Sequence, residues 1–250
     1  MHPLSVSRVR WSTRCAPVLL AGVLCLGPAG RASAAPLQAA DTAHCVDAHS
    51  LDLRRILPAP PADGSAEQQA ELAELHRFQA QRTTPDIELA RADQATVYWI
   101  FKSAFHSRRF MNSQLPLLNA LFVHMSADEA AVLAPAQEAF ARRRPFDVDL
   151  QLQPMIANVR NRSYPSAHAL WGYVGALVLA DMVPEKRDAL LARAAQYAQG
   201  RLVAGVNYPS DIEAGRLAGT ALAAMLFDCT AFATEEAAAK QELRKALALP

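Results

Sequence analysis

Apolar side chains recur every three to four residues from Ser65 almost to the C-terminus of this 250-residue chain. This spacing is typical of amphipathic α-helices, and the alternation of Val, Ile and Thr that marks β-strands is absent. Helix start signals punctuate the pattern, among them the capping boxes Ser65–Gln68 and Ser126–Glu129. The sequence therefore predicts an all-α fold built as a single helical bundle. The expected helices begin near Ser65, Thr84, Gln114, Ser126, Ser166, Pro184, Ser210 and Thr234.

Some of these helices carry further expectations. The helix that begins near Thr84 is expected to continue to Phe105. Pro135 is expected to kink the helix that follows Ser126, because proline removes a backbone donor. Gly215 and Gly219 fall on one face of a later helix, where they are expected to allow close contact with a neighbouring helix.

The first 34 residues have the pattern of a secretory leader. Arginines between residues 8 and 14 precede an apolar run at 16–26, and small residues at 32–34 form a cleavage site. A membrane anchor is the alternative, but the apolar run is short for a span. The mature chain is therefore expected to begin at Ala35 and to be periplasmic or secreted.

Two regions are expected after the leader. Residues 35–64 are rich in proline and alanine and lack sustained periodicity, which predicts an extended arm. Residues 65–250 are expected to form one domain, and this length can bury a sizeable core. The longest later apolar run, 167–183, is interrupted by polar residues, so no membrane span is expected in the mature chain. A homo-oligomer remains open.

Charge and cysteine content limit the function classes. Removing the leader removes four arginines and no acidic residue, which leaves 21 basic against 24 acidic side chains. This balance argues against nucleic acid or an anionic membrane as partner.

Only Cys45 and Cys229 remain after removal of the leader, and in an oxidising compartment they favour one disulfide between the arm and the last helices. Two free buried thiols are the alternative.

Five polar residues stand at or near expected helix ends: Arg144, Ser166, His168, Arg201 and Asp211. A phosphoryl group carries charge on several oxygens, so its site needs fixed cations and N–H donors. Guanidinium groups supply both, and the helix that Ser166 opens adds backbone amides. His168 lies in the first turn of that helix and suits a general acid. The order and spacing of these residues predict a small phosphorylated molecule or inorganic phosphate as ligand.

The same residues lie in longer motifs that resemble a known family. Arg144-Pro145, residues 163–169, Gly200-Arg201 and residues 207–211 are similar to the three-part signature of the type 2 phosphatidic acid phosphatase superfamily. Residues 57–66 extend the likeness to the exported bacterial class A non-specific acid phosphatases, so that it runs from about residue 55 to 230. The resemblance implies the helical bundle that this superfamily shares with vanadium haloperoxidases.

The resemblance also implies roles for individual residues. Arg144, Ser166, the amide of Ala167 and Arg201 would hold phosphate, and His168 would protonate the leaving alcohol. The family needs no metal and no cofactor for this reaction.

The nucleophile position departs from the family pattern. In the family, a histidine attacks phosphorus to form a phosphohistidine, and the residue that matches Asp211 orients it. Asn207 stands at the position of that histidine. A carboxamide nitrogen is neither basic nor nucleophilic, and loss of a nucleophile can cost roughly a millionfold in turnover. The other histidines at 76, 106 and 124 lie on other expected helices and are not expected to replace it.

Three milder departures accompany Asn207. Gln137 stands where the family has a phosphate-binding lysine, which removes a charge and keeps a donor. Ala167 replaces a glycine whose amide survives the change, and Gly200 replaces a serine. Arg142 and Arg143 are expected to be solvated charges at a helix end.

These observations leave several functions open. The first is an exported acid phosphatase, a phosphoric monoester hydrolase that works slowly or by a variant route such as water attack assisted by Asp211 and Asn207. The second is a pseudoenzyme that binds phosphate or phosphorylated ligands without turnover. The third is an exported helical protein with a structural or interaction role. A vanadium haloperoxidase fits least, because its metal ligand is the histidine that is missing.

Overall fold

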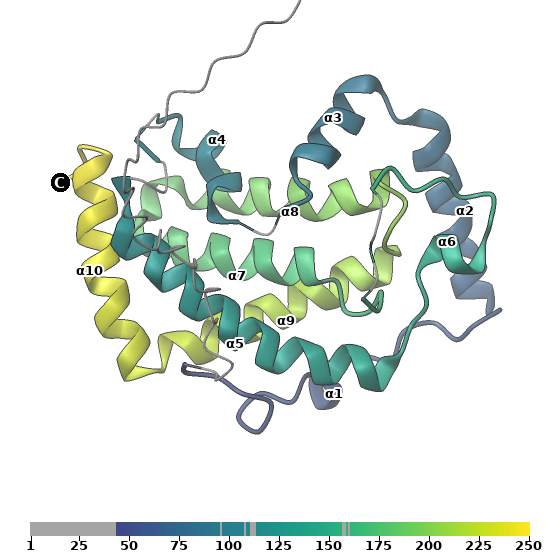
Figure 1. Ribbon diagram of the computed structural model, residues 1–250, viewed down its shortest axis with the longest axis horizontal. Coiled ribbons are helices and arrows are strands. Elements are labelled where there is room, and N and C mark those ends of the chain that lie inside the picture. Colours follow the sequence, from purple (N-terminus) through teal and green to yellow (C-terminus); the bar gives the residue numbers. More distant parts are fainter. Residues whose placement is uncertain (1–43, 96, 108, 111–113, 157–158, 160) are drawn as a thin grey trace, which may run out of the picture. The chain divides into compact units, whose positions relative to one another are not determined.

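A computed structural model describes residues 44–250, except 96, 108, 111–113, 157, 158 and 160 (Figure 1). The described residues are helical with irregular connections and contain no strand, so the all-α prediction is confirmed. The expected leader, residues 1–34, lies outside the described residues. The helices are α1 Leu53–Ile56, α2 Ala66–Gln81, α3 Thr84–Ala92, α4 Lys102–Phe105, α5 Pro116–Phe140, α6 Pro145–Val148, α7 Ala167–Met182, α8 Arg187–Val203, α9 Pro209–Phe227 and α10 Thr230–Ala246, with 3-10 turns at Tyr98–Phe101 and Pro184–Lys186.

Helix α7 forms the centre of the bundle. It lies between α8 and α9, with α5 packed beside it (Figure 1). Apolar residues occur all around α7, and its Leu170, Val174 and Leu179 are fully buried. A helix that is apolar on every face can only be accommodated inside a bundle.

Two glycines set the distance between α7 and α9. A Cβ atom on Gly215 would lie 2.5 Å from the carbonyl oxygen of Ser166, and one on Gly219 would lie 2.5 Å from that of Leu170. Real Cβ atoms do not approach backbone oxygens so closely, so only glycine permits this packing. The expectation of close helix contact is confirmed. It brings the start of α7 against the start of α9, where the predicted site residues lie.

The described part of the N-terminal arm, residues 44–64, differs from the expected extended segment. Asp52 caps the short helix α1, and Val46 and Leu53 are buried in the main core. Cys45 and Cys229 are joined by a disulfide, as the cysteine count predicted. The arm is therefore packed against the helices and covalently linked to the start of α10.

Some expected helix boundaries are wrong. The helix at Thr84 ends at Ala92 instead of continuing to Phe105. It stops because Asp93 leaves the helix and pairs with Arg193 of α8. No helix begins at Ser126, because the apolar face of α5 continues through that position to Phe140.

Two later helices start earlier or are capped differently than expected. Helix α9 begins at Pro209 rather than at Ser210, and the carboxylate of Asp211 accepts the backbone N–H of Tyr208 as its cap. Helix α10 begins at Thr230 rather than near Thr234, which allows Phe232 to pack in the core.

One stretch of the described residues, Pro116–Val148, is long and apolar enough to cross a membrane, and the bent pair α9 and α10 meets the same test jointly. The expectation that no apolar run reaches this length is therefore wrong. Core helices of bundles satisfy this criterion too, and Leu118, Leu121 and Met125 of the stretch are buried against other helices.

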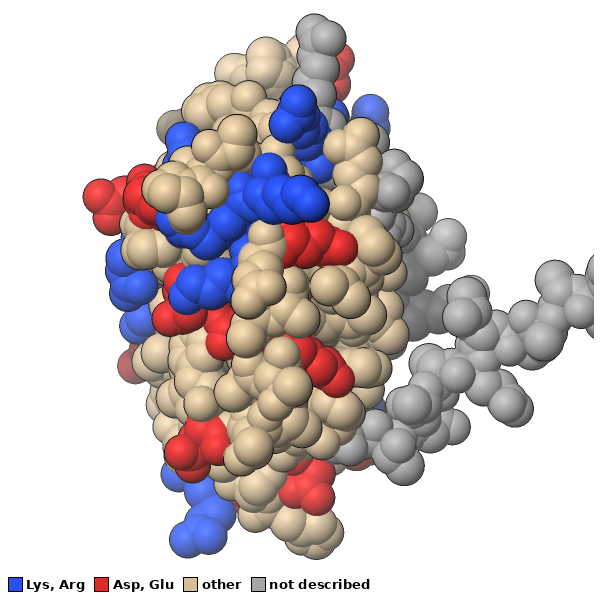
Figure 2. All heavy atoms as spheres, turned by 90° about the vertical axis from the view of Figure 1, so that its left-hand side faces the viewer, with Lys and Arg blue, Asp and Glu red and all other residues tan. Residues whose placement is uncertain are grey.

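The exposed charges are of mixed sign. On the face in Figure 2, basic side chains gather mainly in the upper part, and acidic side chains lie among and below them. Helix α10 contributes the ion pairs Lys240–Asp181 at 3.1 Å and Arg244–Glu185 at 3.0 Å. Exposed pairs of this kind stabilise a fold by about 1 kcal/mol or less.

Candidate functional site

Most of the predicted site residues meet at one cavity of about 310 Å³. Helices α5, α7 and α8 supply part of its wall, and the segments after α3, between α5 and α6, after α6 and before α9 supply the rest. A larger cavity of about 610 Å³ beside Trp99 and Lys102 contains none of the predicted phosphate ligands. The described residues that line the first cavity are Gln94, Glu129, Arg144, Ile156, Val159, Asn161, Ala167, His168, Arg201 and Asn207.

Arg144 lies at the N-terminus of α6 and is almost fully buried. Its guanidinium donates to the carbonyl oxygens of Asn161, Arg162 and Val206 and to Oδ1 of Asn161, at 2.7–3.0 Å. These neutral acceptors hold the side chain in place without cancelling its charge. Burial lowers the pKa of Arg144 to about 10, so the group stays positive at neutral pH.

Arg201 lies in the last turn of α8 and is 4% exposed. Its Nε and Nη1 atoms are buried, and no described residue accepts a hydrogen bond from them. Burial, and then the nearby charge of Arg144, lower the pKa of Arg201 to about 10. A charged, buried donor without a partner is costly unless a ligand satisfies it. The two guanidiniums thus form a positive cavity wall.

His168 lies in the first turn of α7 beside these arginines. Its Nε2 atom is 2.9 Å from the carbonyl oxygen of Gln94, and its ring stacks on Tyr197. A carbonyl oxygen only accepts, so this bond places the proton on Nε2 and leaves Nδ1 free to accept one. Burial, then the charge of Arg201, lower the pKa of His168 to about 3. The ring is therefore neutral without ligand, and its role as general acid remains a prediction that requires a bound anion to raise this pKa.

Glu129 of α5 also lines the cavity and was not predicted as a site residue. It is 7% exposed, and burial raises the pKa of its carboxyl to about 8. The group is mostly protonated at neutral pH, so it does not cancel the charges of Arg144 and Arg201. Sequence reasoning placed Glu129 in a capping box at Ser126, which the continuous helix α5 rules out.

Asn207 lies between α8 and α9, and its side chain is held by hydrogen bonds. Its Nδ2 atom donates to the carbonyl oxygen of Ser163 at 2.8 Å and to Oδ2 of Asp211 at 3.2 Å. The amide thus supplies the donor to Asp211 that an imidazole N–H would supply at this position. Its Oδ1 atom is an acceptor and has no nucleophilic character.

Arg142 corrects the expectation of a solvated charge at a helix end. It is 5% exposed and lies over the ring of Tyr208, 3.8 Å from the centroid. Its guanidinium pairs at 2.6 Å with both Asp211 and Glu71. The buried Asp211 also accepts from the hydroxyl of Ser163. Arg142 and Ser163 therefore hold Asp211 in place, and Glu71 holds Arg142. The spacing of these residues in the sequence gave no signal of these contacts.

Two predicted phosphate ligands, Gln137 and Ser166, do not line the cavity. Gln137 is buried and donates to the carbonyl oxygen of Pro165 at 2.9 Å. The hydroxyl of Ser166 accepts the N–H of Ala169, which makes Ser166 the N-cap of α7 as expected. Gly200, the departure before Arg201, is not a lining residue either. Ala167, in contrast, lies at the cavity.

The histidines at 76, 106 and 124, which were not expected to replace the missing nucleophile, also lie away from the cavity. His76 lies 2.8 Å from Asp149, and His124 lies 2.7 Å from Glu235. Neither His76, His124 nor His106 is among the described residues of the cavity wall, where His168 is the only imidazole.

Known proteins that are similar to this chain include bacterial acid phosphatases. Residues 116–235 match the PAP2 superfamily. A non-specific acid phosphatase of Providencia stuartii is 27% identical over 216 residues, which cover 82% of this chain and 86% of that protein. A non-specific acid phosphatase of Salmonella typhimurium is 34% identical over 114 residues, 44% of this chain and 46% of that protein.

A solved structure adds a comparison of folds. A bacterial vanadium-dependent iodoperoxidase is similar with a TM-score of 0.56 and 17% identity, over 71% of this chain and 53% of that chain. At this identity the likeness concerns the fold alone. The stretch that matches the PAP2 superfamily, residues 116–235, contains helices α5 to α9 and the start of α10.

Proposed function

We propose that this acid phosphatase-like protein binds inorganic phosphate or a small phosphate monoester without hydrolysing it through a phosphohistidine. The observation that supports this most is Arg201, a buried guanidinium whose Nε and Nη1 atoms lack a described partner. Arg144 adds a second buried positive charge to the same cavity. Two like charges repel each other in a buried site, and a bound dianion relieves that repulsion and supplies acceptors.

The proposed loss of catalysis rests on position 207. Asn207 provides a hydrogen bond to Asp211 but no electron pair that can attack phosphorus. Water attack assisted by Asp211 is also disfavoured. Asp211 is fully buried, and both of its carboxylate oxygens accept hydrogen bonds from Arg142, Ser163, Asn207 or Tyr208.

We further propose that the chain acts outside the cytoplasm. The leader pattern of residues 1–34 and the disulfide Cys45–Cys229 support this location, because such bonds persist in oxidising compartments. Residues 35–64 and 65–250 would then be exported together as arm and domain.

Asn207→His is expected to introduce hydrolysis of an aryl phosphate at acid pH. An imidazole at this position can keep the donor to Asp211 through one nitrogen and present the other to phosphorus. We expect turnover to rise at least about tenfold over the native protein. The measurement compares the native protein, Asn207→His and Asn207→Gln, and only the histidine variant should gain activity. Equal rates in all three would contradict the role given to position 207.

A second candidate function is slow hydrolysis by direct water attack, which the protonated carboxyl of Glu129 favours. Water would form the new P–O bond, the bond to the alcohol oxygen would break, and Glu129 would donate its proton to that oxygen. Both protons of the water would remain on the released dihydrogen phosphate, and one of them would then pass to the Glu129 carboxylate. Native turnover clearly above that of Arg201→Ala, and lost in Glu129→Gln, would favour this candidate over binding alone.

The pKa of Glu129 predicts how binding depends on pH. Below pH 8 its carboxyl is mostly neutral, and above pH 8 the carboxylate repels a bound phosphate. The proton therefore favours the bound state, and affinity for a phosphate monoester is expected to fall roughly tenfold between about pH 7 and pH 9. The monoester stays dianionic over this range, so its own titration contributes little. Calorimetry should show the decline in the native protein and a flat profile in Glu129→Gln. An equal decline in both would remove Glu129 from the explanation.

A further inference from the structure

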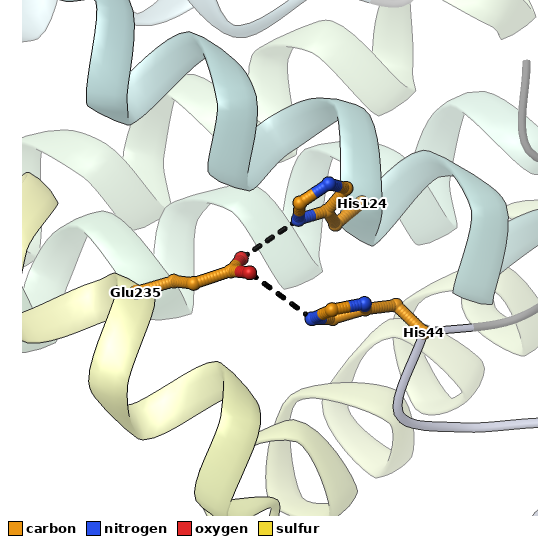
Figure 3. A group of neighbouring side chains, drawn as sticks. All are labelled: His44, His124 and Glu235. Atoms are coloured by element: carbon orange, nitrogen blue, oxygen red, sulfur yellow. Dashed lines mark hydrogen bonds and ion pairs between the residues drawn. The ribbon is translucent and has the colours of Figure 1, made fainter.

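A group of three side chains lies away from the phosphate cavity. His44 of the arm and His124 of α5 both point toward Glu235 of α10, and their two rings are stacked 4.4 Å apart (Figure 3). The Nε2 atom of His44 is 3.1 Å from one oxygen of Glu235, and the Nδ1 atom of His124 is 2.7 Å from the other. One ligand atom of each residue lies within 4.8 Å of the other two.

The structure assigns this group as a site for a divalent transition-metal ion, with zinc as the best match. Two imidazole nitrogens and one carboxylate oxygen form a ligand set that zinc accepts in tetrahedral sites, where water completes the coordination. Calcium and magnesium prefer oxygen ligands and are a poor match. Ligand atoms of a tetrahedral zinc site lie about 3.3 Å apart, so the two N–O pairs, now at 3.1 and 2.7 Å, would open slightly to admit the ion.

The backbone around the site is held in place before any ion binds. Asp128, one turn after His124 in α5, is buried, and its Oδ1 atom accepts the backbone N–H groups of His44, Cys45 and Val46 at 2.6–3.1 Å. This carboxylate fixes the arm against the same helix that carries His124. Such anchoring lowers the entropy cost of bringing a ligand from the arm to the helices.

A covalent bond restrains the third segment. The disulfide Cys45–Cys229 joins the residue after His44 to the N-cap of α10, less than two turns before Glu235. All three ligands are thus attached to segments that are already tied together. The side chains nevertheless keep between 31% and 40% of their surface exposed, which leaves an ion a path from solvent.

The metal would act as a second cross-link of the N-terminal arm. It would join the arm, α5 and α10 at one point, next to the disulfide. An ion that binds only the folded state stabilises that state. The inference is independent of the phosphate cavity, since none of its residues lines that cavity.

Isothermal titration of the chelator-treated protein with zinc chloride tests the site. We expect one zinc ion per chain with a dissociation constant of roughly 1 μM or tighter, and affinity reduced by roughly a hundredfold in His124→Gln and in Glu235→Gln. His76→Gln is the matched control, because His76 contacts a single carboxylate, Asp149, and belongs to no group of three. Its zinc binding should equal that of the native protein. Cobalt in place of zinc should give the visible absorption of a tetrahedral ion in the native protein and in His76→Gln, but not in His124→Gln or Glu235→Gln.

Thermal unfolding separates a metal site from a simple network of ion pairs. Zinc, but not magnesium, is expected to raise the melting temperature of the native protein and of His76→Gln, and to leave His124→Gln unchanged. If the three residues served only as ion pairs, His124→Gln would differ from the native protein equally with and without zinc. That result, or the same zinc affinity in native protein and His124→Gln, would overturn the assignment.

Discussion

Replacement of Arg142 by alanine is expected to lower the free energy of unfolding by about 3–5 kcal/mol. The change leaves Asp211, which is 0% exposed, without its cationic partner and removes the ion pair with Glu71. It also removes the contact between the guanidinium and the ring of Tyr208. Urea unfolding of the native protein and Arg142→Ala, followed by circular dichroism, measures the effect.

The neighbouring arginine is a matched control for this prediction. Arg143 pairs with Asp63 at 3.2 Å, but both side chains are more than half exposed. Arg143→Ala is therefore expected to cost less than about 1 kcal/mol. A double-mutant cycle identifies the cause, because Asp211→Asn should cost less in Arg142→Ala than in the native protein. Additive effects would show that the buried charge of Asp211 is not the reason for the loss.

Arg201→Ala is expected to reduce phosphate affinity by about a hundredfold or more, because two charge-assisted hydrogen bonds of roughly 1.5 kcal/mol each are lost. Calorimetry with inorganic phosphate measures this change. Arg201→Lys should fall between the alanine variant and the native protein, since an ammonium keeps the charge but not the planar pair of donors. Arg187→Ala, at the exposed start of the same helix, removes the same charge far from the cavity and should bind like the native protein.

Arg201→Ala is also expected to be at least as stable as the native protein when no phosphate is present. Arg201 is buried beside Arg144, and its Nε and Nη1 atoms have no described acceptor, so its removal relieves an unfavourable burial. Loss of binding together with undiminished stability is the pattern of a residue kept for a ligand. A large loss of stability in Arg201→Ala would instead indicate a structural role.

The carboxamide of Asn207 is part of the hydrogen-bond network around Asp211. Asn207 preserves the hydrogen bond to Asp211, and Asp211 keeps its pairing with Arg142. The hydrogen bonds around Asp211 therefore do not require a histidine at position 207. Function is decided by a few atoms in the cavity, whereas the fold depends on the whole bundle.

Local features of the structure were predictable from the sequence. The helical content follows from apolar spacing, and Ser65 and Ser166 cap the helices that they were expected to cap. The close contact at Gly215 and the disulfide at Cys45 were expected as well. These features depend on residues a few positions apart, on the absence of a Cβ atom, or on a cysteine count that allows one pairing.

The sequence by itself determined the helical fold class, the start of helices such as those at Ser65 and Ser166, and the residue types available for an anion site. Only the tertiary structure decided which partner each polar side chain meets: Arg142 was expected in solvent and pairs with Asp211, and Gln137 was expected at phosphate and donates to Pro165. It also brought Glu129 to the cavity. The physical reason is that capping and periodicity act within one or two helical turns, whereas the pairing of a buried charge depends on segments that meet only when the bundle packs.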